Sequence, residues 1–172
     1  VYAESKHKGE KRVLAESPRN VVVRTASLFG AAGSSGKGGN FIETIIKKAL
    51  AGETVSVVDD IVMSPTYTRD MAARIWKLIA LEIPGGIYHV VNDGHCSWHS
   101  FAAEAFGLLS LPPPKAVSSS SFPSKMKRPP YTVLASEKLS ALGLPLLRPW
   151  RAALRAYLVE KGHLSDGFPL NR

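Results

Sequence analysis

The sequence predicts an α/β fold, because helix-forming stretches alternate along it with short β-branched runs. A second observation is the run at residues 20–30, which opens with three valines and is typical of a parallel strand buried on both faces. That run directly follows a predicted helix at residues 2–16, which ends before a turn cluster at residues 17–20. Helix followed by buried strand is the order expected of an α/β domain.

Helices are predicted from apolar spacing, N-cap residues and helix-stopping residues. After the first helix, the second runs over residues 41–51, with Asn40 as its N-cap and Gly52 as its end. The third starts from a cap at Thr68 or Asp70 and stops at residues 84–86, and the fourth starts after Ser97. A short helix capped by Ser136 is then expected up to residue 142, and a last helix at residues 150–161.

Two helices carry apolar stripes that predict their buried faces. In the third helix the stripe consists of Met71, Ala72, Ile75, Trp76, Ile79 and Ala80. In the last helix it consists of Trp150, Ala153, Leu154, Tyr157 and Leu158.

Further strands are predicted at residues 54–60, 86–92 and 116–120. A proline-rich and basic loop follows at residues 122–131, and the tail from residue 163 has no periodicity. These segments complete one domain, since 172 residues suffice for a sizeable core.

Composition narrows the class of protein. The chain is 45% hydrophobic and 21% charged, which is typical of a globular domain. No apolar run approaches the roughly 20 residues that span a bilayer, and the start of the chain lacks the apolar core of a signal peptide. We therefore expect a cytoplasmic protein with no membrane partner.

The net charge of +8 raises the question of a nucleic-acid partner. Basic residues are scattered, however, and the longest cluster, Lys125, Lys127 and Arg128, lacks the interleaved aromatics of RNA-binding surfaces. We expect no nucleic acid, and an anionic small ligand such as a nucleotide diphosphate accounts for the same excess.

The cysteine and histidine residues do not form a pattern that predicts a metal site or a disulfide. The single cysteine, Cys96, rules out an internal disulfide and a cysteine-based zinc site, and is expected to be a buried or half-buried thiol at a strand end. His89, His95 and His99 lack neighbours that complete a ligand set, so no metal site is predicted.

The chemistry-bearing pattern is Tyr2 and Lys6, four residues apart at the start of the first helix. This spacing brings both side chains onto one helical face, where the ammonium favours the ionised form of the phenol. Such a tyrosine can exchange protons near neutral pH. The alternative is a solvated helix face with no chemical role.

No glycine-rich motif of the dinucleotide-binding or Walker type is complete in this sequence. Residues 33–39 are glycine-rich and contain a lysine, but the spacing is wrong for a phosphate loop, and we expect a mobile loop there. The first residue, Val1, is not an initiator methionine, which leads us to expect the distal part of a longer protein.

Several short motifs occur in an order that resembles the C-terminal half of an extended short-chain dehydrogenase/reductase, of the dTDP-4-dehydrorhamnose reductase family. The resemblance covers about residues 1–160. Its motifs are Tyr2-x-x-x-Lys6 with Gly9-Glu10, Arg24-Thr25, Phe29-Gly30, Gly39-Asn40-Phe41, Val57-Val58-Asp59-Asp60, Ser64-Pro65-Thr66-Tyr67-Thr68-Arg69-Asp70, Gly86-Ile87-Tyr88-His89 and Arg128-Pro129.

The resemblance implies the distal part of a Rossmann-type fold with its small substrate-binding subdomain, and without the N-terminal dinucleotide-binding half. Residues 1–60 would form the end of the Rossmann-type portion, with the Tyr-Lys helix and substrate-binding elements. Residues 61–160 would form mostly the substrate-binding subdomain, and residues 161–172 a tail.

The implied reaction is reduction of the C4 keto group of dTDP-4-dehydrorhamnose to dTDP-L-rhamnose by NADPH or NADH. Tyr2 would protonate the C4 oxygen, while Lys6 would hold the cofactor ribose and lower the pKa of the tyrosine. The third catalytic residue of the family, a serine or threonine, would lie before Val1. The chain alone is therefore expected to be inactive.

The resemblance also implies substrate-binding residues. A helix start would face the nucleotide diphosphate, a turn would approach the sugar or base, and a basic loop would close over the phosphates. For each segment the alternative is structural: a helix cap, a turn residue or solvated loop charge. The implied residues are Asn40, Phe41, Ser64, Thr66, Lys127 and Arg128.

The implied partner is a nucleotide-diphosphate sugar, and the implied assembly is a homodimer. Some family members hold dimers together with a divalent ion such as Mg²⁺, for which no ligand is assigned here. Two departures from the family pattern leave the exact substrate open: Ser27 stands where a tryptophan is usual, and residues 61–63 replace a Gln-x-Gly.

Other functions remain open at this point. One is a non-catalytic regulatory subunit of the same fold, like the β-subunit of methionine adenosyltransferase. Others are another nucleotide-sugar epimerase or reductase, or a remnant that binds a nucleotide sugar weakly and catalyses nothing.

Overall fold

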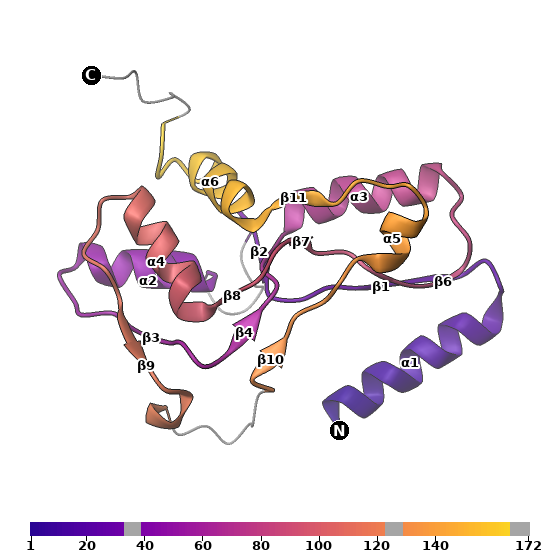
Figure 1. Cartoon of the computed structure of the whole chain (residues 1–172), viewed down its shortest axis with the longest axis horizontal. Coiled ribbons are helices and arrows are strands. Elements are labelled where there is room, and N and C mark those ends of the chain that lie inside the picture. Colours follow the sequence, from indigo (N-terminus) through magenta and orange to yellow (C-terminus); the bar gives the residue numbers. More distant parts are fainter. Residues whose placement is uncertain (33–38, 123–128, 166–172) are drawn as a thin grey trace.

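The computed structural model describes residues 1–32, 39–122 and 129–165, and confirms the α/β class (Figure 1). Lys127, Arg128, most of the glycine-rich loop and most of the predicted tail lie outside these ranges. The helices are α1 (Tyr2–Glu16), α2 (Phe41–Leu50), α3 (Thr68–Ala80), α4 (Trp98–Leu108), α5 (Glu137–Ala141) and α6 (Trp150–Glu160), with a 3₁₀ turn at Ser119–Ser121.

The strands are short and pair mostly in parallel. They are β1 (Val21–Arg24), β2 (Leu28–Phe29), β3 (Ser56–Val58), β4 (Val62–Met63), β5 (Thr66–Tyr67), β6 (Gly86–His89), β7 (Asn92–Asp93), β8 (Cys96–Ser97), β9 (Lys115–Val117), β10 (Tyr131–Thr132) and β11 (Leu147–Pro149).

The longest pairing joins β1 to β6, parallel and in register from Val21 opposite Gly86 to Arg24 opposite His89. Four further parallel pairs are β2 with β5, β3 with β9, β4 with β10 and β7 with β11, and β8 joins β4 antiparallel. Parallel neighbours require long crossover connections, and the helices between the strands supply them. In Figure 1, α3 and α1 lie on opposite sides of the β1–β6 pair.

The predicted N-caps of α2 and α4 are confirmed, whereas the predicted cap of α3 at Thr68 or Asp70 is wrong. Tyr67 stands at the N-cap of α3 and makes no side-chain cap hydrogen bond, because the Asp70 carboxylate is engaged by Asn92 and Arg148 instead. The Asn40 side chain accepts a hydrogen bond from Glu43 N at 3.0 Å, and the Ser97 hydroxyl accepts one from Ser100 N at 2.9 Å. Gly52 follows α2 with a φ of +76°, the left-handed conformation that glycine adopts without a Cβ penalty.

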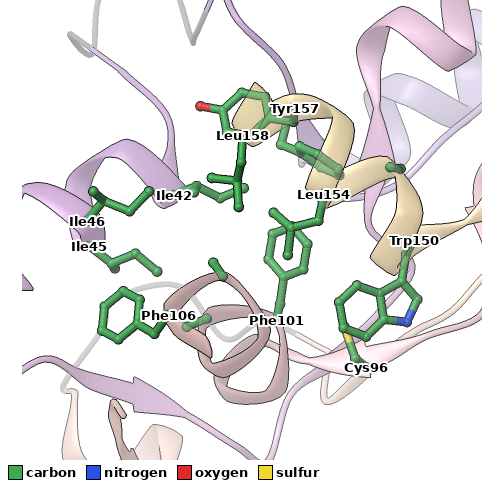
Figure 2. Packing of buried hydrophobic residues seen from close by; sticks show 14 of the residues in the cluster. Ile42, Ile45, Ile46, Cys96, Phe101, Phe106, Trp150, Leu154, Tyr157 and Leu158 are labelled. Carbon is green, nitrogen blue, oxygen red and sulfur yellow. The ribbon is translucent and has the colours of Figure 1, made fainter. Parts of the chain in front are cut away.

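The main core lies where α2, α4 and α6 meet (Figure 2). The predicted stripe of α6 is confirmed, since all of its residues are buried. In Figure 2, Leu154 and Leu158 point from α6 toward Phe101 and Ile42 on the facing helices. The Phe29 ring packs edge-on against Phe101 with ring centres 5.2 Å apart, so the core continues into the strands.

A smaller core joins α3 to β6 and to the segment around α5. Its buried members are Leu78, Tyr88, Val90, Leu139 and Leu144. The main core has members on both sides of position 60, and the half-buried Val21 and Val23 pack against the smaller core. The predicted domain boundary near residue 60 stays a prediction.

The predicted single strand at residues 20–30 is wrong in two respects. It is two strands, β1 and β2, separated by a break in which Ser27 has a φ of +45°. Moreover, β1 is only half-buried along its length. A run of valines indicates that a strand can be covered on both faces, but it does not show that the cover is present. Among the described residues, β1 belongs to a two-stranded sheet in which β6 pairs with it on one edge only.

The predicted buried stripe of α3 is also corrected. Arg74 and Leu78 are its buried residues, while Trp76 is 72% exposed and Ile79 is also exposed. The helix turns the face of Leu78 toward the small core, and the adjacent apolar face meets solvent. Periodicity identified an apolar helix, but the choice between two neighbouring faces depends on which one finds a partner.

Cys96 is buried at a strand end, as predicted, and burial raises the pKa of its thiol to about 12. Among the described helices, none combines the length and the apolar character needed to cross a membrane.

Candidate functional site

Tyr2 and Lys6 lie on the same face of α1, near its N-terminus. The Lys6 Nζ lies 5.8 Å from the centre of the Tyr2 ring. The tyrosine side chain is open to solvent, at 77% exposure. The pair therefore has the predicted proximity and is accessible to a ligand, while its catalytic role stays a prediction.

An ion pair holds α1 against β1. Arg24 donates from Nε to Glu10 Oε1 at 2.8 Å and from a terminal nitrogen to Glu10 Oε2 at 2.6 Å. The hydrogen bond from Arg24 lowers the pKa of the Glu10 carboxyl, and the same contact raises the pKa of the guanidinium. Bidentate pairing of this kind fixes orientation as well as distance. Glu10 and Arg24, which belong to separate sequence motifs, thus set the position of the Tyr2 helix.

Asn40, a predicted substrate residue, is fully engaged by the protein itself. Its Oδ1 caps α2, and its Nδ2 donates to the Gly30 carbonyl at 3.0 Å and to the Tyr157 hydroxyl at 2.8 Å. Phe41, the next residue, is half-buried and packs edge-on against Trp98 with ring centres 4.8 Å apart. The side chains at the start of α2 therefore hold the helix against neighbouring segments.

The predicted turn residues Ser64 and Thr66 are completely buried. The Ser64 hydroxyl accepts a hydrogen bond from Leu134 N at 3.1 Å, and Thr66 N donates to the Ser27 carbonyl at 3.2 Å. Both contacts fasten the turn to neighbouring segments. Contact of either side chain with a substrate stays a prediction.

A close approach at Gly30 brings the start of α2 and this turn together. A Cβ added at Gly30 would lie 1.9 Å from the Thr68 hydroxyl oxygen, so only glycine fits there. The Gly30 carbonyl also receives the Asn40 amide. Among the described residues, no hydrogen bond or ion pair connects Tyr2 or Lys6 with these two segments.

Asn92 is a buried polar residue that sequence reasoning missed. Its Oδ1 accepts a hydrogen bond from Tyr67 N at 2.8 Å, and its Nδ2 donates to Asp70 at 2.8 Å and to the Arg148 carbonyl at 3.0 Å. Arg148 in turn pairs bidentately with Asp70, at 2.8 and 2.6 Å. Asn92 therefore fastens the start of α3 to β11. An amide directly after the apolar pair Val90-Val91 is the signal that could have found it.

The two acidic residues after β3, Asp59 and Asp60, connect neighbouring segments through hydrogen bonds. The Asp60 carboxylate accepts hydrogen bonds from Ser119 N at 2.9 Å, from the Ser118 hydroxyl at 2.9 Å and from the Ser119 hydroxyl at 3.0 Å. The backbone bond from Ser119 is the main cause that lowers the pKa of Asp60. Asp59 accepts a hydrogen bond from Ser97. These contacts fix the chain on the N-terminal side of the predicted basic loop.

No cluster of three or more histidine, cysteine, aspartate or glutamate side chains suited to a metal ion occurs in the described part of the chain. The carboxylates named above are engaged by arginine, serine or backbone donors.

Comparisons with known proteins place this geometry in a family. The model of the RmlD substrate binding domain matches residues 1–162. The chain is 37% identical over 169 residues to the spore coat polysaccharide biosynthesis protein SpsK of Bacillus subtilis (strain 168), covering 96% of this chain and 56% of that protein. It is 39% identical over 161 residues to dTDP-4-dehydrorhamnose reductase of Streptomyces griseus, covering 90% and 51%.

The fold agrees with solved structures. dTDP-4-dehydrorhamnose reductase from Bacillus anthracis str. Ames, in complex with NADP, superposes with a TM-score of 0.83 at 33% identity, covering 92% of this chain and 55% of that one. A dTDP-glucose 4,6-dehydratase from the same organism has a TM-score of 0.72 at 16% identity, which shows the shared Rossmann-type fold alone.

The chain spans about half the length of the curated relatives it matches. The predicted resemblance to dTDP-4-dehydrorhamnose reductases is confirmed by sequence and by fold. With a family model that matches nearly its whole length, the chain belongs to the RmlD substrate binding domain family.

Proposed function

We propose that this chain is the substrate-binding part of an NADPH-dependent reductase that converts the C4 keto group of dTDP-4-dehydrorhamnose to the alcohol of dTDP-L-rhamnose. The observation that carries the proposal is the exposed Tyr2 with Lys6 beside it, on a helix of a chain from this family. The Bacillus anthracis relative was solved with NADP, which supports the choice of cofactor.

The chemistry assigned to the chain is proton transfer. The Tyr2 hydroxyl gives its proton to the C4 oxygen of the sugar, and the ammonium of Lys6 stabilises the phenolate that remains. A bound nicotinamide supplies the hydride that C4 receives. An exposed phenol and ammonium on one face fit a ribose and a keto-sugar, because both side chains can donate hydrogen bonds to oxygen atoms.

The diphosphate of the substrate is proposed to bind at the start of α2. The first N–H groups of a helix have no acceptor within it, and the helix dipole favours an anion there. Since the Asn40 side chain is engaged and Ile42 is completely buried, the backbone N–H of the half-buried Phe41 supplies the donor in this proposal. The turn at Ser64–Thr66 would shape the sugar or base site, and Lys127 and Arg128 would reach the phosphates.

Turnover in this proposal requires a dinucleotide-binding half in addition to residues 1–172. The chain alone should bind the nucleotide and should not oxidise NADPH. A homodimeric assembly and a cytoplasmic location stay predictions.

Two assays test the proposal. Calorimetry with dTDP should detect binding to the 172-residue chain. A chimera in which residues 1–172 follow the first half of the Bacillus subtilis relative should consume NADPH with dTDP-4-dehydrorhamnose, measured as loss of absorbance at the reduced-nicotinamide band. In the chimera, Tyr2→Phe should lower kcat by about 10²- to 10⁴-fold without weakening NADPH binding.

Unchanged turnover of the Tyr2→Phe chimera would remove the tyrosine from the mechanism. A chimera that binds dTDP and NADPH yet never turns over would instead favour the non-catalytic regulatory subunit.

A further inference from the structure

The start of α2 is held by a chain of polar side chains that begins at the far end of α6. Asn40 Nδ2 donates to the Tyr157 hydroxyl at 2.8 Å, and that hydroxyl donates to the Glu43 carboxylate. The same carboxylate faces His163 Nε2, which lies 3.1 Å from both of its oxygens. Four side chains thus link the N-cap of one helix to the residues that follow another.

The direction of these hydrogen bonds is fixed by Tyr157. Its side chain is completely buried, and burial, together with the neighbouring Glu43 carboxylate, raises the pKa of the phenol. The phenol therefore stays protonated and donates its hydrogen bond to Glu43, which leaves its oxygen lone pairs to accept from the Asn40 amide. Because Nδ2 faces Tyr157, the Asn40 Oδ1 must face the backbone of α2.

The other end of this series of hydrogen-bonded side chains, at His163, is fixed by the backbone. Gly162 adopts a φ of +74° after α6, and His163 N donates to the Leu158 carbonyl at 2.8 Å, as in a Schellman motif. The imidazole is thereby aimed at Glu43. Burial raises the pKa of the Glu43 carboxyl, but the hydrogen bonds from Tyr157 and His163 and the charge of Lys161 outweigh it and lower the pKa overall.

We propose that Tyr157, Glu43 and His163 are positioning residues for the nucleotide diphosphate. They set the rotation of the Asn40 amide, which in turn caps α2 and holds the Gly30 carbonyl next to it. The start of α2 then holds the half-buried Phe41, with its backbone N–H, in one orientation. This inference rests on the proposed function, which assigns the diphosphate to that turn.

The matched pair of variants is Tyr157→Phe and Tyr67→Phe in the 172-residue chain. Both tyrosines are buried in the main core, and both donate from their hydroxyl to a glutamate, Glu43 or Glu160. Only Tyr157 contacts Asn40. Tyr157→Phe should therefore weaken dTDP binding by about three- to tenfold, the effect of one lost hydrogen bond. Tyr67→Phe should lower the Tm by about as much as Tyr157→Phe does, but should leave the dTDP affinity unchanged.

A second readout needs no ligand. In nuclear magnetic resonance spectra of Tyr157→Phe, the Asn40 side-chain amide protons should be shifted and should exchange faster with water. In Tyr67→Phe, the same protons should behave as in the unmodified chain. At the other end, His163→Ala should loosen the same amide. His163→Gln, which keeps a donor toward Glu43, should restore it at least in part.

The outcomes separate the two proposals. If the unmodified chain does not bind dTDP, the proposed nucleotide site is wrong, while the Asn40 resonances still decide whether the polar chain orients the amide. If dTDP binds and Tyr157→Phe changes neither its affinity nor the Asn40 amide, the positioning role is overturned. Equal effects of Tyr67→Phe would overturn it as well, since they would show a general loosening of the core.

Discussion

Helices α1 and α6 lie in opposite environments. No residue of α1 is buried, and the helix is attached to β1 through Glu10 and Arg24. In α6, the whole apolar stripe is buried against α2 and α4. The difference shows that the main core is complete by itself, while the layer of α1, β1, β6 and α3 has apolar surface that the described residues leave open.

The open surface has a definite place. Val13 on α1 and Trp76, Ile79 and Leu81 at the end of α3 are exposed. A two-stranded parallel sheet is a small platform, since parallel strands are normally covered on both faces. In the proposed function, which calls for a dinucleotide-binding half, this layer is where the rest of a Rossmann-type sheet would join.

The largest expected contrast comes from truncating one apolar side chain in each region. Leu154→Ala should lower the free energy of unfolding by about 2–5 kcal/mol, because it leaves a cavity in the main core. Val13→Ala, at a position 44% exposed, should change it by less than about 0.5 kcal/mol. Urea denaturation followed by circular dichroism measures both, and similar losses would contradict the division.

A paired substitution of tryptophan sharpens the contrast further. Trp150 is 2% exposed and Trp76 is 72% exposed. Trp150→Phe should destabilise the chain by about 1–2 kcal/mol, and Trp76→Phe by less than about 0.5 kcal/mol. In the chimera with the first half of the Bacillus subtilis relative, acrylamide quenching of Trp76 fluorescence should fall. Quenching that stays the same would show that the joined half covers another face.

Acid should detach α1 before it affects α6. The pKa of Glu10 is lowered by Arg24 from its ordinary value of 4.5, so this contact stabilises the folded state above that pH and is lost as the pH falls through the lower, folded-state pKa. The pKa of Glu43 is also lowered, so its contacts with α6 weaken in acid as well. However, α6 is also held by its buried apolar residues in the main core. Amide protection factors below pH 4.5 should therefore fall for residues 2–16 and persist for α6.

The control for the acid experiment is Glu10→Gln, which removes the titrating group. Its α1 protection should be about two- to fivefold lower than that of the unmodified chain at neutral pH, as for a surface ion pair, and should vary little with acid. If α1 in this variant still lost protection with the same pH dependence, another carboxylate would be responsible.

The predictions that succeeded depend on residues near one another in the chain. Asn40 caps α2 through a residue three positions later, and the stripe of α6 repeats at helical spacing over Trp150–Glu160. The order of the motifs identified the family, because each motif encodes a local turn, cap or pair. The approach of Tyr2 and Lys6 belongs to this class, being set by a single turn of helix.

The sequence alone thus determined the helices, the segments of β1, β3, β6 and β9, the caps of α2 and α4 and the family, while β4, β5, β8, β10 and β11 were not predicted. The tertiary structure decided which apolar face of α3 was buried, that Ser64 and Thr66 point inward, and that Asn92 joins α3 to β11. It also brought Tyr157 to Glu43, 114 positions apart. The physical reason is that spacing records what a side chain can bury or donate, whereas its actual partner depends on surfaces that meet only when distant segments pack.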